Sequence, residues 1–246
     1  MEGVWSPNRQ TRHWRLDFFR PWRERAVRPR VVHQAKMGPP KRSILTFNVN
    51  GIWNKKSEVE LLLNRQNVGI AAIQETLVSK KEYSLHLAGY EVYQRHRTKN
   101  FRGHALAIHK SLTSYKVGNS EEECFIHVKV IGLTDSKPWH VIAAYLPSGG
   151  NYRSQRTTAL KEILAEYKKV ITKEHDAKVI ILGDFNMRHD QLRKRLKVQK
   201  TGLKPVEIRG SGLTFHRKST RWSDIDSIVA NGQAEKVMAH ARVVRC

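Results

Sequence analysis

The stretch Val179-Ile180-Ile181-Leu182-Gly183-Asp184-Phe185-Asn186 does most to decide how this sequence folds. An aliphatic run followed at once by glycine predicts a buried β-strand that ends in a polar loop. The loop carries Asp184 and Asn186, two positions apart. Both side chains can hold a water molecule or a phosphate oxygen, and the aspartate can also accept a proton. A strand-end aspartate can equally cap a turn, so the rest of the chain must decide between the two interpretations.

Length and charge limit the classes of protein that this chain can belong to. Its 246 residues suit one packed domain, with 45 Lys and Arg against 22 Asp and Glu and a net charge of +23. A compact chain with this charge repels itself, which favours a polyanionic partner. Nucleic acid fits best, and an anionic membrane surface or a generally basic source proteome are the alternatives. No apolar run reaches the ~18 residues of a membrane span, so we expect no membrane insertion.

The cysteines and histidines indicate neither a disulfide framework nor a zinc site. Cys124 and Cys246 are the two cysteines of the chain, and the sequence has no CxxC or HxxxH pair. A reducing setting fits this usage, so we expect an intracellular, nuclear protein, with an organelle as the alternative. The oligomeric state cannot be read from the sequence.

Residues 1–42 differ in amino-acid composition from the rest, and this composition predicts a basic, flexible leader. Arginines, tryptophans and prolines dominate the segment, and a short helix over residues 11–19 is the single element expected there. The leader could be a nucleic-acid-contacting arm, an Arg-rich organelle presequence or a segment without function.

From residue 43 to 246 we predict one domain in which short apolar strands alternate with two helices. The helices are expected over residues 57–66 and 157–172, where apolar residues recur at helical spacing. Many strands with well-separated helices predict an α/β protein, a four-layer sandwich of two β-sheets flanked by helices. The expected strands cover residues 44–49, 68–73, 90–95, 105–108, 125–131, 140–144, 179–182, 212–215 and 225–230.

Polar side chains follow these strands at the points where the strands end. Asn48 and Asn50 follow the first strand, Glu75 follows the second, and Tyr145 closes a later one. Asp226 belongs to the last. We expect a shared site at one edge of the sheets. A carboxylate can bind Mg²⁺ through oxygen, a second carboxylate can activate water, and amides and a phenol can hold phosphate oxygens, which together suit phosphodiester hydrolysis.

Five motifs follow one another along the chain. They are Phe47-Asn48-Val49-Asn50-Gly51, Ile73-Gln74-Glu75-Thr76, Tyr145-Leu146-Pro147-Ser148, Gly183-Asp184-Phe185-Asn186 and Asp224-Ile225-Asp226. In this order they resemble the endonuclease/exonuclease/phosphatase superfamily, and within it the apurinic-type endonuclease domain of LINE-like non-LTR retrotransposons. The resemblance runs from about residue 42 to residue 244.

The resemblance implies a Mg²⁺-dependent DNA-nicking endonuclease, with Mn²⁺ as a substitute cofactor and DNA as the partner. It assigns metal binding to Glu75 and Asn50, although many relatives carry aspartate at the second position. The remaining positions would be catalytic. Tyr145 would contact the scissile phosphate, Asp184 would activate water, Asn186 and Asn48 would line the phosphate site, and Asp226 would support a catalytic histidine.

The expected catalytic histidine has no clear equivalent in this chain. In relatives, a Ser-Asp-His motif follows the aspartate that corresponds to Asp226. In this chain the one histidine after Asp226 is His240, and no aspartate precedes it directly. We therefore expect the domain to be truncated, to lack its last core strand and to have impaired activity.

Two basic segments offer contacts for a nucleic-acid backbone. Residues 95–102 contain Arg95, Arg97, Lys99 and Arg102, which we predict to bind nucleic acid, although such a loop can simply be solvated. The same two interpretations apply to residues 188–200. A remnant that binds nucleic acid without cutting it is the main alternative function, and a phosphatase or phospholipase of the same superfamily is the further alternative.

Overall fold

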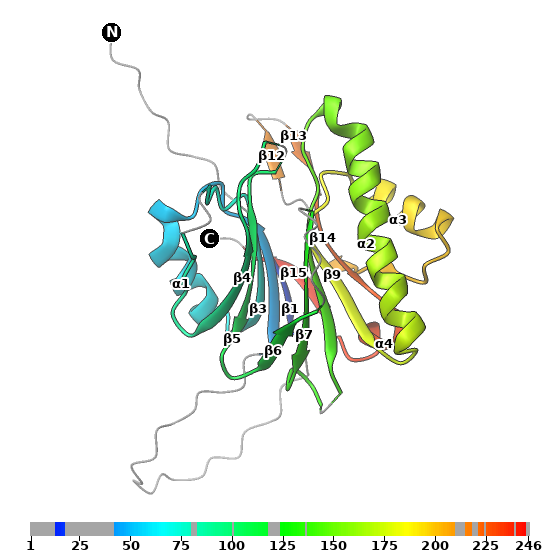
Figure 1. Cartoon of the computed structure of the whole chain (residues 1–246), viewed down its shortest axis with the longest axis horizontal. Helices are drawn as coiled ribbons and strands as arrows, with labels where there is room; N and C mark the ends of the chain where they lie inside the picture. The colour runs from blue at the N-terminus through cyan, green and yellow to red at the C-terminus, as the bar shows by residue number, and fades with distance from the viewer. Residues whose placement is uncertain are drawn as a thin grey trace, which may run out of the picture.

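Two β-sheets pack face to face, with helices on their outer sides (Figure 1). This arrangement confirms the α/β sandwich expected from the alternation of strands and helices. The structure is a computed structural model. It describes residues 13–17, 42–79, 83–99, 101–117, 124–135, 137–209, 215–217, 221–223, 225–238 and 240–244.

The first sheet has the strand order β11-β15-β1-β2-β3-β5-β4. Strands β2 and β3 are parallel, and the crossover between them contains the 3-10 helix η1 (Trp53–Lys55) and the helix α1 (Lys56–Arg65). The strands are β11 (Ile208–Arg209), β15 (His240–Val244), β1 (His13–Asp17), β2 (Ser43–Asn48), β3 (Val68–Gln74), β5 (His104–His109) and β4 (Tyr90–Arg95).

The second sheet has the order β10-β14-β9-β8-β7-β6. Its strands are β10 (Lys204–Pro205), β14 (Asp226–Ala230), β9 (Lys178–Asp184), β8 (Trp139–Tyr145), β7 (Phe125–Ile131) and β6 (Thr113–Lys116). Strands β8 and β9 are parallel and joined through η2 (Gly150–Tyr152) and the long helix α2 (Arg153–Lys173). Helices α3 (His189–Val198) and α4 (Gly232–Glu235) follow β9 and β14, and β12 (Phe215–Arg217) pairs with β13 (Arg221–Ser223).

Strand β1 corrects the expectation for the N-terminal segment. The short helix predicted over residues 11–19 is wrong at His13–Asp17, which form a strand between β2 and β15. Pairing on both sides supplies backbone hydrogen bonds that outweigh the weak helical preference of so short a segment. Strand β2 is consequently an interior strand of its sheet. The expected strand over residues 212–215 falls mostly outside the described residues.

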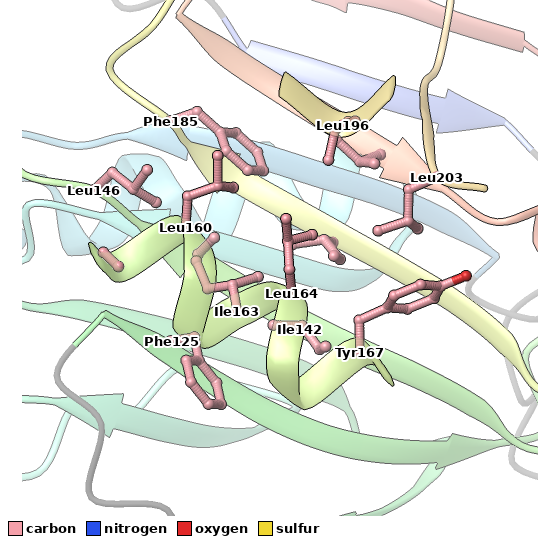
Figure 2. Packing of buried hydrophobic residues seen from close by; sticks show 14 of the residues in the cluster. Phe125, Ile142, Leu146, Leu160, Ile163, Leu164, Tyr167, Phe185, Leu196 and Leu203 are labelled. Carbon is pink, nitrogen blue, oxygen red and sulfur yellow. The ribbon is translucent and has the colours of Figure 1, made fainter. Parts of the chain in front are cut away.

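Helix α2 covers the outer face of the second sheet and holds α3 beside it. Leu160, Ile163 and Leu164 point from α2 onto Ile142 of β8 and toward Phe185 of the loop after β9 (Figure 2). All five side chains are buried, and each Å² of apolar surface removed from water contributes roughly 25 cal/mol to the stability of this layer around strand β9. Among the described residues, no helix is both long and apolar enough to cross a membrane.

The space between the sheets changes from apolar to polar at one end. In the strands whose side chains the structure describes, alternate residues face this space, and over most of its length they are aliphatic, such as Ile44, Ile70 and Leu182. At the end near the site, the same alternation places polar residues there. They are Thr46 and Asn48 of β2, Gln74 of β3, His104 of β5, Tyr145 of β8, Asp184 of β9 and Asp226 of β14.

Gly183 allows β9 to approach β8 just before this polar layer. Its φ is +151°, and a Cβ atom there would lie 1.8 Å from the carbonyl oxygen of Ala144 and 2.8 Å from the carbonyl carbon. No side chain larger than hydrogen fits without moving the backbone. The glycine of the opening stretch therefore sets the position of Asp184, the next residue.

We predict that Gly183→Ala lowers the free energy of unfolding by ~3 kcal/mol or more, because the clash is with backbone atoms. Urea denaturation of both proteins would measure the change. Gly232→Ala is the control, since its Cβ would meet nothing within 4 Å, and we expect a change within about 0.5 kcal/mol. Equal effects of the two substitutions would contradict the account of Gly183.

Candidate active site

Asp184 is the residue on which the site converges. It ends β9 and is 1% exposed, and both of its carboxylate oxygens accept hydrogen bonds. Asn48 Nδ2 donates to Oδ2 at 3.4 Å, and the backbone N–H of Asn186 donates to Oδ1 at 2.9 Å. Asn48 Oδ1 in turn accepts the backbone N–H of Asn50 at 3.0 Å. The structure thus joins the first predicted motif to the fourth across the two sheets.

A second carboxylate lies beside the first. Asp226 is the direct cross-strand neighbour of Asp184 in the β14–β9 pairing, and it is also buried. Burial, the charge of Asp226 and then that of Glu75 raise the pKa of Asp184 well above its ordinary value. A carboxyl group with a raised pKa accepts a proton more readily near neutral pH than an exposed aspartate does.

Glu75 and Tyr145 form the neighbouring part of the site. The hydroxyl of Tyr145 donates to Glu75 Oε1 at 3.4 Å, and Glu75 sits just beyond β3 with a φ of +54°. Burial and the charges of Glu75 and Asp184 raise the pKa of Tyr145. The phenol consequently keeps its proton and remains a hydrogen-bond donor at neutral pH.

Three loops are joined side by side at this end of the first sheet. Gly51 N–H donates to the carbonyl of Glu75 at 2.8 Å, and Leu77 N–H donates to the carbonyl of Arg102 at 3.0 Å. The loop after β2, the loop after β3 and the loop before β5 therefore form one hydrogen-bonded layer. This layer places Asn50, Glu75 and Arg102 next to one another.

Arg102 binds both residues to which metal binding was assigned. Its Nη1 lies 2.5 Å from Glu75 Oε2, and its Nη2 donates to Asn50 Oδ1 at 3.0 Å. Carboxylate and amide oxygens are the ligands that Mg²⁺ prefers, and Mg²⁺ needs only one or two of them because it retains water. The oxygen atoms of Glu75 and Asn50 are therefore suitable ligands for the ion. In this structure the positively charged guanidinium of Arg102 binds them instead. Among the described residues, no group of three or more His, Cys, Asp or Glu could hold a metal ion.

The basic side chains of residues 95–102 differ in their exposure to solvent. Arg95 ends β4 as the cross-strand neighbour of His104, is only partly exposed, and its charge acts on that histidine. Arg97 and Lys99 are exposed, and Arg102 reaches Glu75. The side chain of His240 and all of Asp224 fall outside what the structure describes.

Two buried polar residues beneath the site were not anticipated from the sequence. His104 is fully buried beside Gln74 in the β3–β5 pairing, and its ring centroid lies 6.1 Å from that of Tyr145. Burial, aided by Arg95, lowers the pKa of His104 to about 3, so it is neutral. Neither ring nitrogen, nor Nε2 of Gln74, has a hydrogen-bond partner within the described part of the chain. His104 and Gln74 both occupy positions of their strands that face between the two sheets. This alternation of inward-facing positions was the signal in the sequence by which they could have been found.

We predict that Asp184→Asn stabilises the metal-free protein. The pKa of Asp184 is higher in the folded protein than its value of about 4 in the unfolded chain. The protonated carboxyl therefore contributes stability at low pH, and this contribution is lost as the pH rises through the folded pKa. The neutral amide of asparagine avoids that loss. Urea denaturation in EDTA at pH 5 and pH 7.5 should show a gain that is larger at the higher pH. Asp176→Asn, an exposed carboxylate before β9, is the control. A loss of stability that is equal at both pH values would contradict the raised pKa.

We predict that Arg102→Gln increases Mg²⁺ affinity on the order of 3- to 10-fold, because the cation no longer competes with a half-exposed guanidinium for Glu75. Isothermal titration of Mg²⁺ into the two proteins measures this without any reaction. Arg97→Gln removes the same charge from the same loop and should change the affinity less than about twofold. Equal gains in both variants would mean that only net charge matters.

Comparison with known proteins places this geometry in a family. Residues 45–238 match the endonuclease/exonuclease/phosphatase family. A search of curated protein sequences gave no match. Among solved structures, the chain is similar to the endonuclease domain of TRAS1, a telomere-specific non-LTR retrotransposon. The identity is 18%, the TM-score is 0.59, and the match covers 78% of this chain and 86% of that one.

Two further structures share the fold at low identity. An AP endonuclease from Archaeoglobus fulgidus is 21% identical with a TM-score of 0.56, covering 76% of this chain and 86% of that one. TDP2 from D. rerio, complexed with a single-strand DNA product, is 16% identical with a TM-score of 0.53, covering 76% and 82%. The matched span includes Asn48, Glu75, Tyr145, Asp184 and Asp226, and the chain belongs to the endonuclease/exonuclease/phosphatase family.

Proposed function

We propose that this chain is a Mg²⁺-dependent phosphodiesterase that nicks DNA, of the retroelement endonuclease type. The observation that carries the proposal is the convergence on Asp184. Asn48 and the backbone of Asn186 hold its two oxygens, and Asp226 lies beside it. These residues come from three strand ends that are far apart in the sequence. A fold stabilised by burial alone has no need for two adjacent buried carboxylates.

Asp184 is suited to orient and deprotonate the attacking water. Its raised pKa brings its proton affinity closer to neutral pH, where a general base works best. The hydrogen bonds from Asn48 and Asn186 hold the carboxylate in one orientation while leaving it lone pairs for a water proton.

Amide and phenol donors are available for the phosphate. Asn186 Nδ2 donates one hydrogen to the carbonyl of Leu146 at 2.7 Å, which leaves its second hydrogen for a non-bridging oxygen. Asn48 Nδ2 likewise donates one hydrogen to Asp184 and has a second hydrogen for a phosphate oxygen. Tyr145, which stays protonated, can transfer its hydrogen bond from Glu75 to a phosphate oxygen. Such donors stabilise the charge that develops on the phosphate during attack.

Glu75 and Asn50 are the residues that would hold Mg²⁺, once Arg102 releases their oxygens. The ion would supply neutralisation of phosphate charge. Arg102 would then be free to pair with the DNA backbone, as was predicted from the sequence.

DNA is the substrate that the charge of the chain favours over the alternatives. A net charge of +23 suits a polyanion better than an inositol phosphate or a sphingomyelin surface. One of the similar structures, TDP2 from D. rerio, is also described as a complex with a single-strand DNA product.

Binding without cutting is the second candidate function, and Arg102 favours it. In a site whose glutamate is already neutralised, Mg²⁺ binds weakly. We therefore expect slow turnover by this chain, since the guanidinium of Arg102 competes with the cation for Glu75.

Plasmid nicking tests the proposal. We predict slow nicking of supercoiled plasmid that requires Mg²⁺ and is abolished by EDTA and by Asp184→Ala. Asp176→Ala removes an exposed carboxylate from the opposite end of β9 and should leave the rate unchanged.

Gel shifts at several salt concentrations complete the comparison. Binding that weakens steeply with salt, together with no nicking at all, would favour the binding-only function. Nicking that persists in EDTA or in Asp184→Ala would contradict the proposed site.

A further inference from the structure

Two exposed aromatic side chains touch one another beside the candidate active site. Trp53 is 51% exposed and Tyr83 is 49% exposed, and their ring centroids lie 6.4 Å apart at an interplanar angle of 81°. Single exposed aromatics are common on protein surfaces. Two such rings in edge-to-face contact, each about half exposed, leave aromatic surface accessible to a ligand.

Trp53 belongs to the loop that carries Asn50. It begins η1 three residues after Asn50, and Lys55 closes this loop by donating from Nζ to the carbonyls of Val49 at 2.7 Å and Asn50 at 3.4 Å. The position of the indole is therefore tied to the position of the assigned metal ligand.

Tyr83 is tied to the start of the basic loop. Its carbonyl oxygen accepts a hydrogen bond from Gln94 Nε2 at 2.7 Å and lies 3.3 Å from His96 Nε2. Gln94 lies in β4, and residues 95–102 follow directly. The aromatic pair consequently spans from the Asn50 loop to the beginning of the basic loop.

The surroundings of the pair are positively charged. The exposed side chains of Arg97 and Lys99 belong to the loop next to Tyr83. Lys56 follows Trp53 closely, and its Nζ lies 4.0 Å from Glu60 Oε1. An aromatic platform flanked by basic side chains is the arrangement that binds single-stranded nucleic acid. The cations pair with phosphates while a base stacks on a ring, and each stacked base adds about 5- to 100-fold in affinity.

We propose that Trp53 and Tyr83 form a stacking site for an unpaired nucleobase next to the bond that is cut. The proposal rests on the proposed function, and it adds a preference for single-stranded or locally opened DNA over closed duplex. A closed duplex buries the base faces that the platform would contact, so it gains only the phosphate contacts.

Fluorescence anisotropy in EDTA measures this preference without cleavage. The probes are a labelled 20-nucleotide single strand and the same strand in a duplex. Trp53→Ala should weaken binding of the single strand by about 5- to 100-fold and of the duplex less than about twofold. Trp53→Phe, which keeps an aromatic face, should restore most of the affinity. Tyr115→Ala is the control, because Tyr115 is 46% exposed on β6.

Trp fluorescence gives a second readout that a structural role would not change. The single strand should quench emission of the unmodified chain, and the quenched component should vanish in Trp53→Phe. Equal weakening for both probes, equal effects of Trp53→Ala and Tyr115→Ala, or no binding of the single strand would overturn the proposal. So would binding to phosphatidylserine vesicles that depends on Trp53 while DNA binding does not. Single-strand binding that depends on Trp53 but without nicking would uphold this site and reject only the cleavage activity.

Discussion

The site depends on the close approach of β8 and β9 at Gly183, where only a hydrogen atom fits against the carbonyl of Ala144. This approach puts Tyr145 and Asp184 next to one another at the ends of two parallel strands. The antiparallel strand β14 then brings Asp226 to the other side of Asp184. A bulkier residue at Gly183 would separate the strands at the point where all three side chains must meet.

Charge is the second constraint, and it opposes folding at this point. Asp184 and Asp226 are buried side by side, and Glu75 is close enough to raise the pKa of Asp184. Burying like charges is unfavourable, so sites of this kind are typical of function rather than of stability. Arg102 offsets the charge of Glu75. The same guanidinium therefore stabilises the free protein and competes with the cation that the proposed chemistry needs.

Much of the fold could be predicted from the sequence because the strands are short, apolar and followed by polar residues. Strands β4 and β7 have the predicted bounds, and α2 extends the predicted helix by a few residues at its start. Strand β1 could not be predicted, because its pairing partners β2 and β15 are remote in the sequence. Local preference says little about a five-residue segment whose conformation is set by its neighbours in a sheet.

The candidate site could be predicted in its residues but not in its contacts. The motifs named Asn48, Glu75 and Asp184, since strand ends meet at a sheet edge. They could not show that Arg102, expected on DNA, binds Glu75, because that contact arises from hydrogen bonds between three loops. His104 was also missed, because the strand was predicted to begin at residue 105, whereas β5 begins at His104.

The most direct test of the central claim is to follow the oxygen of the attacking water. Cleavage of a defined oligonucleotide in H₂¹⁸O with Mg²⁺, followed by mass spectrometry of the fragments, reports where the label enters. The account predicts one ¹⁸O atom in the terminal phosphate and none in the new hydroxyl, because water oriented by Asp184 attacks phosphorus. Label in the sugar hydroxyl, or unlabelled fragments, would contradict it.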